Sequence, residues 1–520
     1  MDDIRMPGRH GPLPGKDPMA RSMLQASLLV SFALLLSRLS GLFREQALAA
    51  RLGIGAQTDA VVVILTLPDL LTAILMSGGF SAALVPALAR ADPAVRVALL
   101  HRIAVFTLGV SAALAFGIFL SSGAVVSLLA PSLDPAGLPG FRAGFTLSLV
   151  AVPVAAVIGV SAAWLQAEGR AAVPGLAVLV FNGVLIVFLA LLSGSGAISF
   201  TALAIALLIA NLLRLGCMLI PMRNTFVRPA VQSRFESGFA RQFAQGVLAV
   251  SLISLTPVIF RSLASLAGSG ELAAYNFAMR LFDLPAGLLT APVNILFLPL
   301  LSRLAGAQDS GFADHALMAI RCTFALTLSA AITCWFFSGE IAALVFGYGA
   351  LAGGGTEAIA ATLRIIIPGL PFLAVFQSCT TALNATRRTG TAFICAAVAL
   401  PPAVGIWWLL DRGGLNSATA ATSGFIAFQG FAALFALLKV GGVPFFVRAL
   451  TALALIFLRA VPVALAAGAL IWFTGAEPSV VMAIPAMGLL SLLLVAVNAP
   501  VIRDLATVRS HRSDVQSEGP

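Results

Sequence analysis

Ionisable side chains inside long apolar segments are the residues of this sequence best placed to do chemistry. The first such segment holds Arg38, Arg44 and Glu45. A charged side chain at the centre of a bilayer costs about 2.5–3.5 kcal/mol, so residues of this kind usually mark a substrate or ion pathway. Later apolar segments hold Asp59, Asp69, Arg280 and Asp283.

Helical spacing decides which of these side chains can act together. Arg38 and Glu45 are seven residues apart and share one face of a helix, whereas Arg44 shares its face with Ser37, about 100° round the helix. Arginines outnumber acids in this segment, which leaves a positive surplus. Because a guanidinium group can bind phosphate oxygens bidentately, the surplus favours an anionic ligand such as a diphosphate.

A purely structural alternative stays open for these charges. Arg280 and Asp283 are three residues apart on a helix and could neutralise each other as an ion pair within a bundle. Arg459 lies alone in a late apolar segment and is interpreted as a snorkelling or helix-packing residue.

Cysteine- or histidine-based chemistry is not expected. The five cysteines all lie in apolar segments without a CxxC pair, and the four histidines lie in tails or polar loops. We therefore expect no catalytic residue, metal site or cofactor. A membrane-bound glycosyltransferase or acyltransferase would need carboxylate or histidine clusters at a membrane face, so the protein is not expected to be an enzyme.

The composition requires a bilayer as solvent. Hydrophobic residues make up 60% of the 520 residues and charged residues 10%, and the mean hydropathy is +1.02. Apolar segments of about 20 residues, without the alternation of barrel strands, predict an all-α polytopic membrane protein. Fourteen spans are expected, near residues 24–50, 58–88, 97–120, 143–166, 172–192, 199–221, 242–266, 272–301, 316–337, 359–385, 391–410, 417–438, 449–473 and 480–502.

The distribution of basic residues orients these spans. Alternate loops, starting with the N-terminal tail, carry 21 of the 31 lysines and arginines. Basic residues collect on the cytoplasmic side, so both termini are predicted to be cytoplasmic in a bacterial inner membrane. The net charge of +10 is then explained without a nucleic-acid partner. The opposite loops are assigned only Arg51, Arg142, Arg261, Arg364 and Arg412.

Two pairs of similar segments predict an internal repeat. Phe80–Arg90 matches Val293–Arg303 in its proline and closing arginine, and Pro153 matches Pro371, 218 residues later. Six spans separate the copies, which predicts two parallel six-helix repeats with a site between them, unless chance similarity of apolar segments explains the match. The expected parts are an N-terminal tail (1–22), an N-terminal lobe (23–222), a linker (223–241), a C-terminal lobe (242–440), two further helices (441–504) and a C-terminal tail (505–520).

Five short motifs carry a family resemblance that extends over essentially the whole chain. They are Ser37–Glu45 (SRLSGLFRE), Gly53–Ala60 (GIGAQTDA), Phe80–Pro86, Met279–Phe282 (MRLF) and Pro368–Phe372 (PGLPF). With these motifs the sequence resembles the MurJ/MviN family of lipid II flippases, which belongs to the multidrug/oligosaccharidyl-lipid/polysaccharide exporter superfamily.

The resemblance implies a function and a set of site residues. It implies a flippase that moves undecaprenyl-diphosphate-linked peptidoglycan precursor from the cytoplasmic to the periplasmic leaflet by alternating access, with the polyprenyl-diphosphate-linked saccharide and the lipid bilayer as its partners. It also implies that the last two helices form a groove for the lipid tail, and we expect a monomer. The implied diphosphate-binding residues are Arg38, Arg44 and Arg280, with Ser37, Glu45, Asp59 and Asp283 as supporting cavity residues.

Departures from the family pattern keep a second function open. Thr72 and Ala73 replace an arginine pair, and Met279 replaces an acid. Pro401 and Gly405 replace the sodium ligands of some members, so no sodium site of that kind is expected. The alternative is an exporter of another lipid-linked oligosaccharide or polysaccharide precursor.

Overall fold

All regular structure in the described part of the chain is helical. In this computed structural model, the described residues are 18–74, 84, 88, 92–191, 198–225, 254–307, 311–352, 354–386, 388, 390–410, 414–474 and 480–503. Long apolar segments form helices because only internal hydrogen bonds can satisfy their backbone in lipid. The all-α prediction is confirmed.

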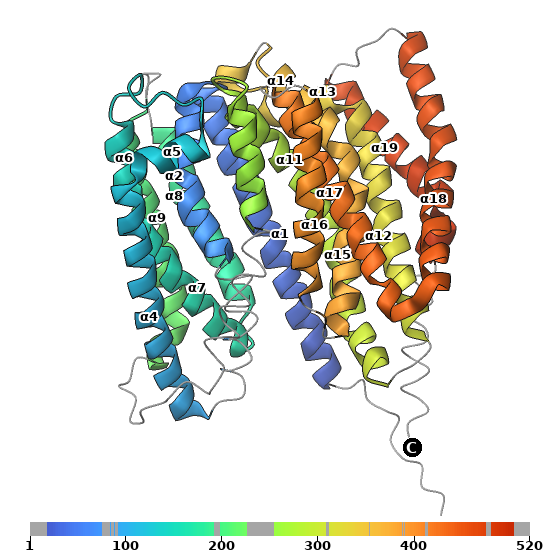
Figure 1. Cartoon of the computed structure of the whole chain (residues 1–520), viewed down its shortest axis with the longest axis horizontal. Coiled ribbons are helices and arrows are strands. Elements are labelled where there is room, and N and C mark those ends of the chain that lie inside the picture. The colour runs from blue at the N-terminus through green and yellow to red at the C-terminus, as the bar shows by residue number, and fades with distance from the viewer. Residues whose placement is uncertain are drawn as a thin grey trace, which may run out of the picture.

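The helices form two groups, with α1 crossing between them (Figure 1). The first group is α1 (Pro18–Leu52), α2 (Ala56–Ile74), α4 (Pro93–Leu120), α5 (Ser122–Leu129), α6 (Phe141–Ser148), α7 (Ala151–Ala167), α8 (Ala172–Leu191) and α9 (Phe200–Leu219), followed by the 3₁₀ helix η2 (Ile220–Thr225). Residues 254–265 are also helical. The second group is α11 (Glu271–Ala307), α12 (Gly311–Phe336), α13 (Ser338–Phe346), η3 (Gly349–Leu351), α14 (Glu357–Ile366), η4 (Ile367–Gly369), α15 (Leu370–Ala385), α16 (Thr391–Leu410), α17 (Leu415–Ala436), α18 (Leu438–Thr474) and α19 (Val480–Val497).

The order of elements repeats between the two groups. A long helix, a short one, a broken helix and two further long helices occur as α4–α9 and again as α12–α17. The broken helix is interrupted just before Pro153 in the first copy, between α6 and α7, and at η4, just before Pro371, in the second. The proline pair therefore marks equivalent breaks. Most of the Phe80–Arg90 segment lies outside the described residues.

Ten helices of the described chain are long and apolar enough to cross a membrane. Each of the fourteen predicted spans lies mainly on helix where its residues are described, with short turns such as Leu149–Val150 within or at the ends of some. Helices α1 and α2 are not among the ten. The protein is a multi-pass membrane protein, and the number fourteen stays a prediction.

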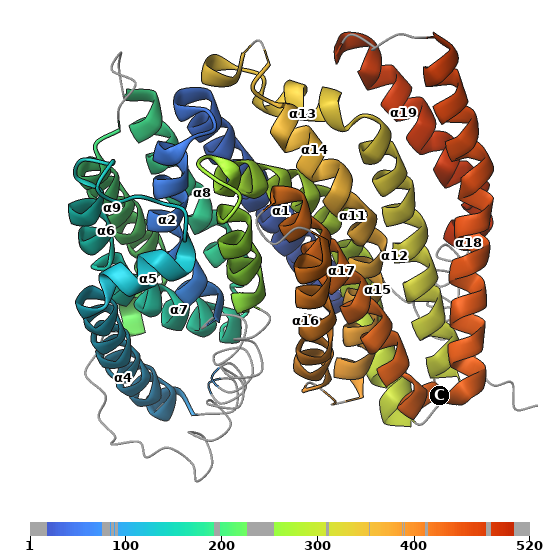
Figure 2. The ribbon, with the colours of Figure 1, turned by 45° about the horizontal axis from the view of Figure 1, so that its top comes forward.

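The last two helices pack on the outside of the second group, against α12 (Figure 2). Helix α18 is kinked at Gly442, whose φ of 70° favours a residue without a Cβ. A groove of about 340 Å³ lies against α12 and α18, and its lining includes Leu317, Arg321, Leu455 and Arg459.

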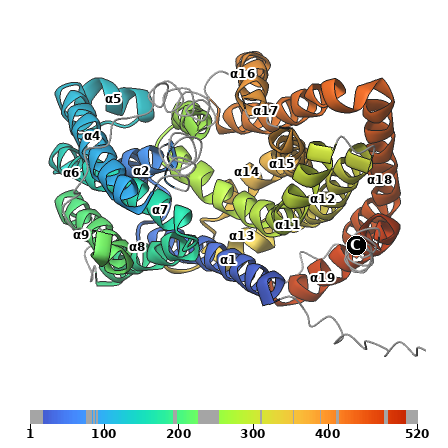
Figure 3. The same cartoon turned by 90° about the horizontal axis from the view of Figure 1, so that it is seen from below.

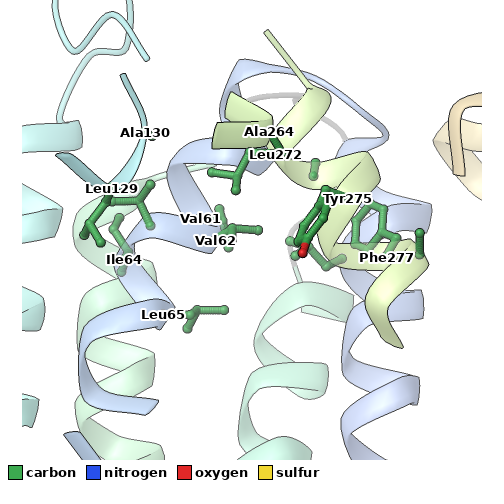
Figure 4. Packing of buried hydrophobic residues seen from close by; sticks show 14 of the residues in the cluster. Val61, Val62, Ile64, Leu65, Leu129, Ala130, Ala264, Leu272, Tyr275 and Phe277 are labelled. Atoms are coloured by element: carbon green, nitrogen blue, oxygen red, sulfur yellow. The ribbon is translucent and has the colours of Figure 1, made fainter. Parts of the chain in front are cut away.

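Two helices of the first group, α1 and α2, contact α11 of the second (Figure 3). Helix α11 contains Pro285, Pro292 and Pro299. A continuous buried cluster joins the groups: Figure 4 shows Val62 of α2 near Leu272 and Tyr275 of α11. This packing brings the charged segments of α1, α2 and α11 together.

Candidate substrate-binding site

The carboxylate of Glu45 links α1 to α11. Its Oε1 lies 2.7 Å from Nη2 of Arg44 and 3.4 Å from Nε of Arg280, and its Oε2 accepts a 3.1 Å hydrogen bond from Asn276. The Glu45 side chain is 2% exposed. A buried carboxylate needs such partners, because burying a lone charge is strongly unfavourable.

Arg38 and Arg44 point to different partners, as the helical spacing predicted. Arg38 shares its face with Glu45, and its Nη1 donates a 3.0 Å hydrogen bond to the backbone carbonyl of Asp283 on α11. Arg44 faces the first group, where its Nη1 lies 4.0 Å from the Asp69 carboxylate of α2. The Arg44 guanidinium carbon also lies 5.9 Å from the ring centroid of Phe181 on α8.

Gly287 of α11 provides space for Arg38. A Cβ atom added to Gly287 would overlap the guanidinium group of Arg38. A glycine is thus needed here for the close approach of α1's side chain to the backbone of α11.

Asp283 and Arg261 complete the cluster on the second group. Asp283 interacts electrostatically with Arg280, Arg38 and Arg261, so Arg280 has Glu45 as well as Asp283 as a counter-charge. Arg261 lies within the helix of residues 254–265 and is half-buried. Its assignment to a loop in the sequence-based charge count was therefore wrong, because a single arginine near the end of an apolar segment gives no local signal of which way it faces.

Arg214 is a second residue that the sequence did not assign to the site. It lies on α9, is 8% exposed, and interacts electrostatically with Asp69. Its guanidinium carbon lies 5.9 Å from the centroid of Phe181, the same ring that Arg44 approaches.

We call these residues the arginine cluster: Arg38, Arg44, Arg214, Arg261 and Arg280, with the acids Glu45, Asp69 and Asp283. Five guanidinium groups face three carboxylates, so mutual ion pairing cannot neutralise the set. Part of the cluster is accessible: Arg38 is exposed, and the Asp69 and Arg280 side chains are 46% and 30% exposed. Surplus positive charge on an accessible rim is suited to an anionic ligand.

The two remaining predicted residues lie differently. Ser37 is half-buried on α1, and its backbone carbonyl accepts a hydrogen bond from Ser40. Asp59 does not join the arginine cluster: its carboxylate oxygens accept hydrogen bonds of 2.6 and 2.7 Å from the backbone amides of Gly270 and Ala273. It therefore caps the N-terminus of α11 from a different group of helices.

Within the described residues, no three His, Cys, Asp or Glu side chains gather in a way that could hold a metal ion. Pro401 and Gly405, which stand at the expected sodium-ligand positions, lie within α16 and offer no side-chain oxygen.

Comparisons with known proteins agree on one family. A family model described as "Lipid II flippase MurJ" matches residues 48–488. A lipid II flippase MurJ of Burkholderia cenocepacia is 27% identical over 345 residues, which cover 63% of this chain and 66% of that protein. A probable lipid II flippase MurJ of Rhizobium tropici is 26% identical over 438 residues, covering 80% and 81%.

Solved structures show the same fold. A lipid II flippase MurJ in an inward closed conformation has a TM-score of 0.77 at 19% identity, covering 92% of this chain and all of that one. An inward-facing multidrug resistance transporter of the MATE family has a TM-score of 0.63 at 16% identity, covering 81% and 98%. Because the family model spans most of the sequence and the fold agrees, the chain belongs to the lipid II flippase MurJ family.

Proposed function

We propose that this protein moves lipid II, the undecaprenyl-diphosphate-linked peptidoglycan precursor, from the cytoplasmic to the periplasmic leaflet. The observation that carries the proposal is the arginine cluster, which lies where α1 and α2 of one group meet α11 of the other. In a family of lipid II flippases, a surplus of guanidinium groups at that junction supports a diphosphate site between two moving lobes.

In this proposal Arg38, Arg44 and Arg280 contact the diphosphate. Arg38 and Arg280 are accessible, whereas Arg44 is buried and paired with Glu45. Ser37, Glu45 and Asp283 position these arginines. Asp59 supports the site only indirectly, by holding the start of α11 against α2.

The undecaprenyl tail needs an apolar path outside the cluster. The groove against α12 and α18 offers apolar residues such as Leu317, Leu455 and Ile456 beside Arg321 and Arg459. We assign the tail to this face of the two C-terminal helices, with the polar headgroup between the two lobes.

The remaining parts of the proposal follow the charge distribution and the family. The protein is a transporter without catalytic activity, lies in the bacterial inner membrane with both termini in the cytoplasm, and works as a monomer. The lobes comprise residues 23–222 and 242–440, with residues 441–504 as the added pair.

Complementation tests this function. We expect the protein to support growth of bacteria depleted of their own lipid II flippase, and Arg44→Ala and Arg280→Ala to abolish that support at unchanged membrane abundance. Lysine at either position should rescue partly, since it keeps the charge and loses the guanidinium fork. Arg142→Ala, which removes an exposed arginine of the same group, is the matched control.

The same experiment distinguishes the second cargo class. Thr72→Arg, which restores the family's arginine, should improve growth support if lipid II is the cargo. A well-inserted protein that fails with and without Thr72→Arg transports another lipid-linked saccharide instead.

A further inference from the structure

Arg214 is buried without the partners that a buried guanidinium needs. Its side chain is 8% exposed on α9, and its Nε has no hydrogen-bond partner. Among the described residues no carboxylate lies within ion-pair distance of it, and its interactions are the electrostatic one with Asp69 and the approach to Phe181. Burying a charge with so few partners is costly, and an anionic ligand that accepts hydrogen bonds from the Arg214 guanidinium would reduce that cost.

The single carboxylate of Asp69 is shared between two arginines. It interacts with Arg44, at 4.0 Å, and also with Arg214. Arg44 also pairs with Glu45 at 2.7 Å, whereas Asp69 is the carboxylate that Arg214 interacts with, and both guanidinium groups approach the same Phe181 ring. In this corner between α2, α8 and α9, Arg214 therefore shares its one carboxylate with Arg44, and the arginine cluster as a whole keeps its positive surplus.

The corner coincides with the family position at which this chain lacks an arginine. Residue 72 lies on α2 three positions after Asp69, so both positions share one face of that helix. At position 72 this chain has a threonine where the family has an arginine. Arg214 brings a guanidinium to the same face from α9, which contacts α2.

We propose that Arg214 is a substrate-binding residue that contacts the diphosphate of the lipid-linked cargo and replaces the arginine missing at position 72. This inference rests on the proposed function. The diphosphate settles against Arg44 and Arg214 on one side and Arg38 and Arg280 on the other. Asp69 holds the first two arginines in place between cargo molecules.

Binding measurements on the purified full-length protein in nanodiscs test this role. The probes are lipid II, undecaprenyl diphosphate and undecaprenyl monophosphate. Arg214→Ala should weaken binding of the two diphosphates by about tenfold to a hundredfold, the scale of one lost charged hydrogen bond. Monophosphate binding should fall by less than about threefold, because Arg38, Arg44 and Arg280 suffice for one phosphate. Arg142→Ala should change none of these.

Asp69→Asn separates substrate binding from charge balance. If Arg214 only neutralises Asp69, Arg214→Ala will have no effect once Asp69 is Asn. If it binds the cargo, the loss of diphosphate affinity will persist in Arg214→Ala/Asp69→Asn relative to Asp69→Asn alone. Thr72→Arg should then restore binding to Arg214→Ala.

The outcomes are separable. Unchanged diphosphate binding by a correctly folded Arg214→Ala, or a loss that disappears with Asp69→Asn, would overturn the role of Arg214 and leave the flippase proposal intact. Absence of lipid II and undecaprenyl diphosphate binding by the unaltered protein would overturn both. If Arg214→Ala does not fold, Arg214→Gln and Arg214→Lys give the same comparison, with Lys expected to keep part of the affinity.

Discussion

Gly287 of α11 leaves the space that the Arg38 guanidinium of α1 occupies. The overlap that a Cβ would cause is with the far end of a flexible side chain, so Gly287→Ala should fold normally and displace Arg38. We expect growth support to fall as in Arg38→Ala, with thermal stability nearly unchanged. Gly183→Ala is the matched control, because a Cβ there meets nothing within 4 Å. Full growth support by Gly287→Ala would show that the observed place of Arg38 is not needed for transport.

Glu45 is expected to determine stability more than any other acid of the arginine cluster. Glu45→Gln removes the buried counter-charge of Arg44 and Arg280, and breaking such a pair costs about 3 kcal/mol. Thermal unfolding of the detergent-solubilised protein should shift to lower temperature. Glu45→Gln/Arg280→Gln should recover part of the loss, since one of the two unbalanced charges is gone. A double variant less stable than Glu45→Gln would contradict this assignment.

Asp59 is predicted to stabilise the contact between α2 and α11. Asp59→Ala leaves the amides of Gly270 and Ala273 without their acceptor, at a cost of about 1–2 kcal/mol. Asp59→Asn keeps one acceptor oxygen and should lose less. The control is Asp134→Ala, which removes a similar 2.9 Å hydrogen bond to the amide of Ala136 in an exposed loop. Equal thermal shifts for Asp59→Ala and Asp134→Ala would contradict the prediction.

The orientation of the chain can be checked with reporter fusions. Fusions after Pro520 and within residues 223–241 should report a cytoplasmic location, because basic residues collect there. A fusion within residues 121–141 should report a periplasmic location. A periplasmic C-terminus would rule out an even number of spans with both ends in the cytoplasm.

The sequence predicted in which relative directions the side chains of one helix point. It could not predict which side chains of other helices contact them. The seven-residue spacing of Arg38 and Glu45 places both toward α11, and Arg44 turns toward α2 and α8. These outcomes depend only on helical geometry. The all-α fold followed equally directly from the length of the apolar segments.

Residues whose roles depend on distant segments were missed or misplaced. Arg214 and Arg261 are single charges in apolar segments, and their place depends on how α9 and the helix of residues 254–265 pack. Asp59 was expected in the cavity, yet its partners lie more than 200 residues later, at the buried N-terminal end of α11, which no local pattern in α2 encodes.

The three prolines of α11 lower the resistance of this helix to bending in one direction more than in others. Pro285, Pro292 and Pro299 follow one another at seven-residue intervals, close to two full turns, so they lie along one stripe of the helix. Each removes one backbone hydrogen bond and bends the helix away from its own ring. The three bends add in nearly the same plane. Helix α11 is therefore expected to bend most easily in one plane. Asp59 holds its N-terminal end, and the Arg38 guanidinium contacts it near its middle, at Gly287.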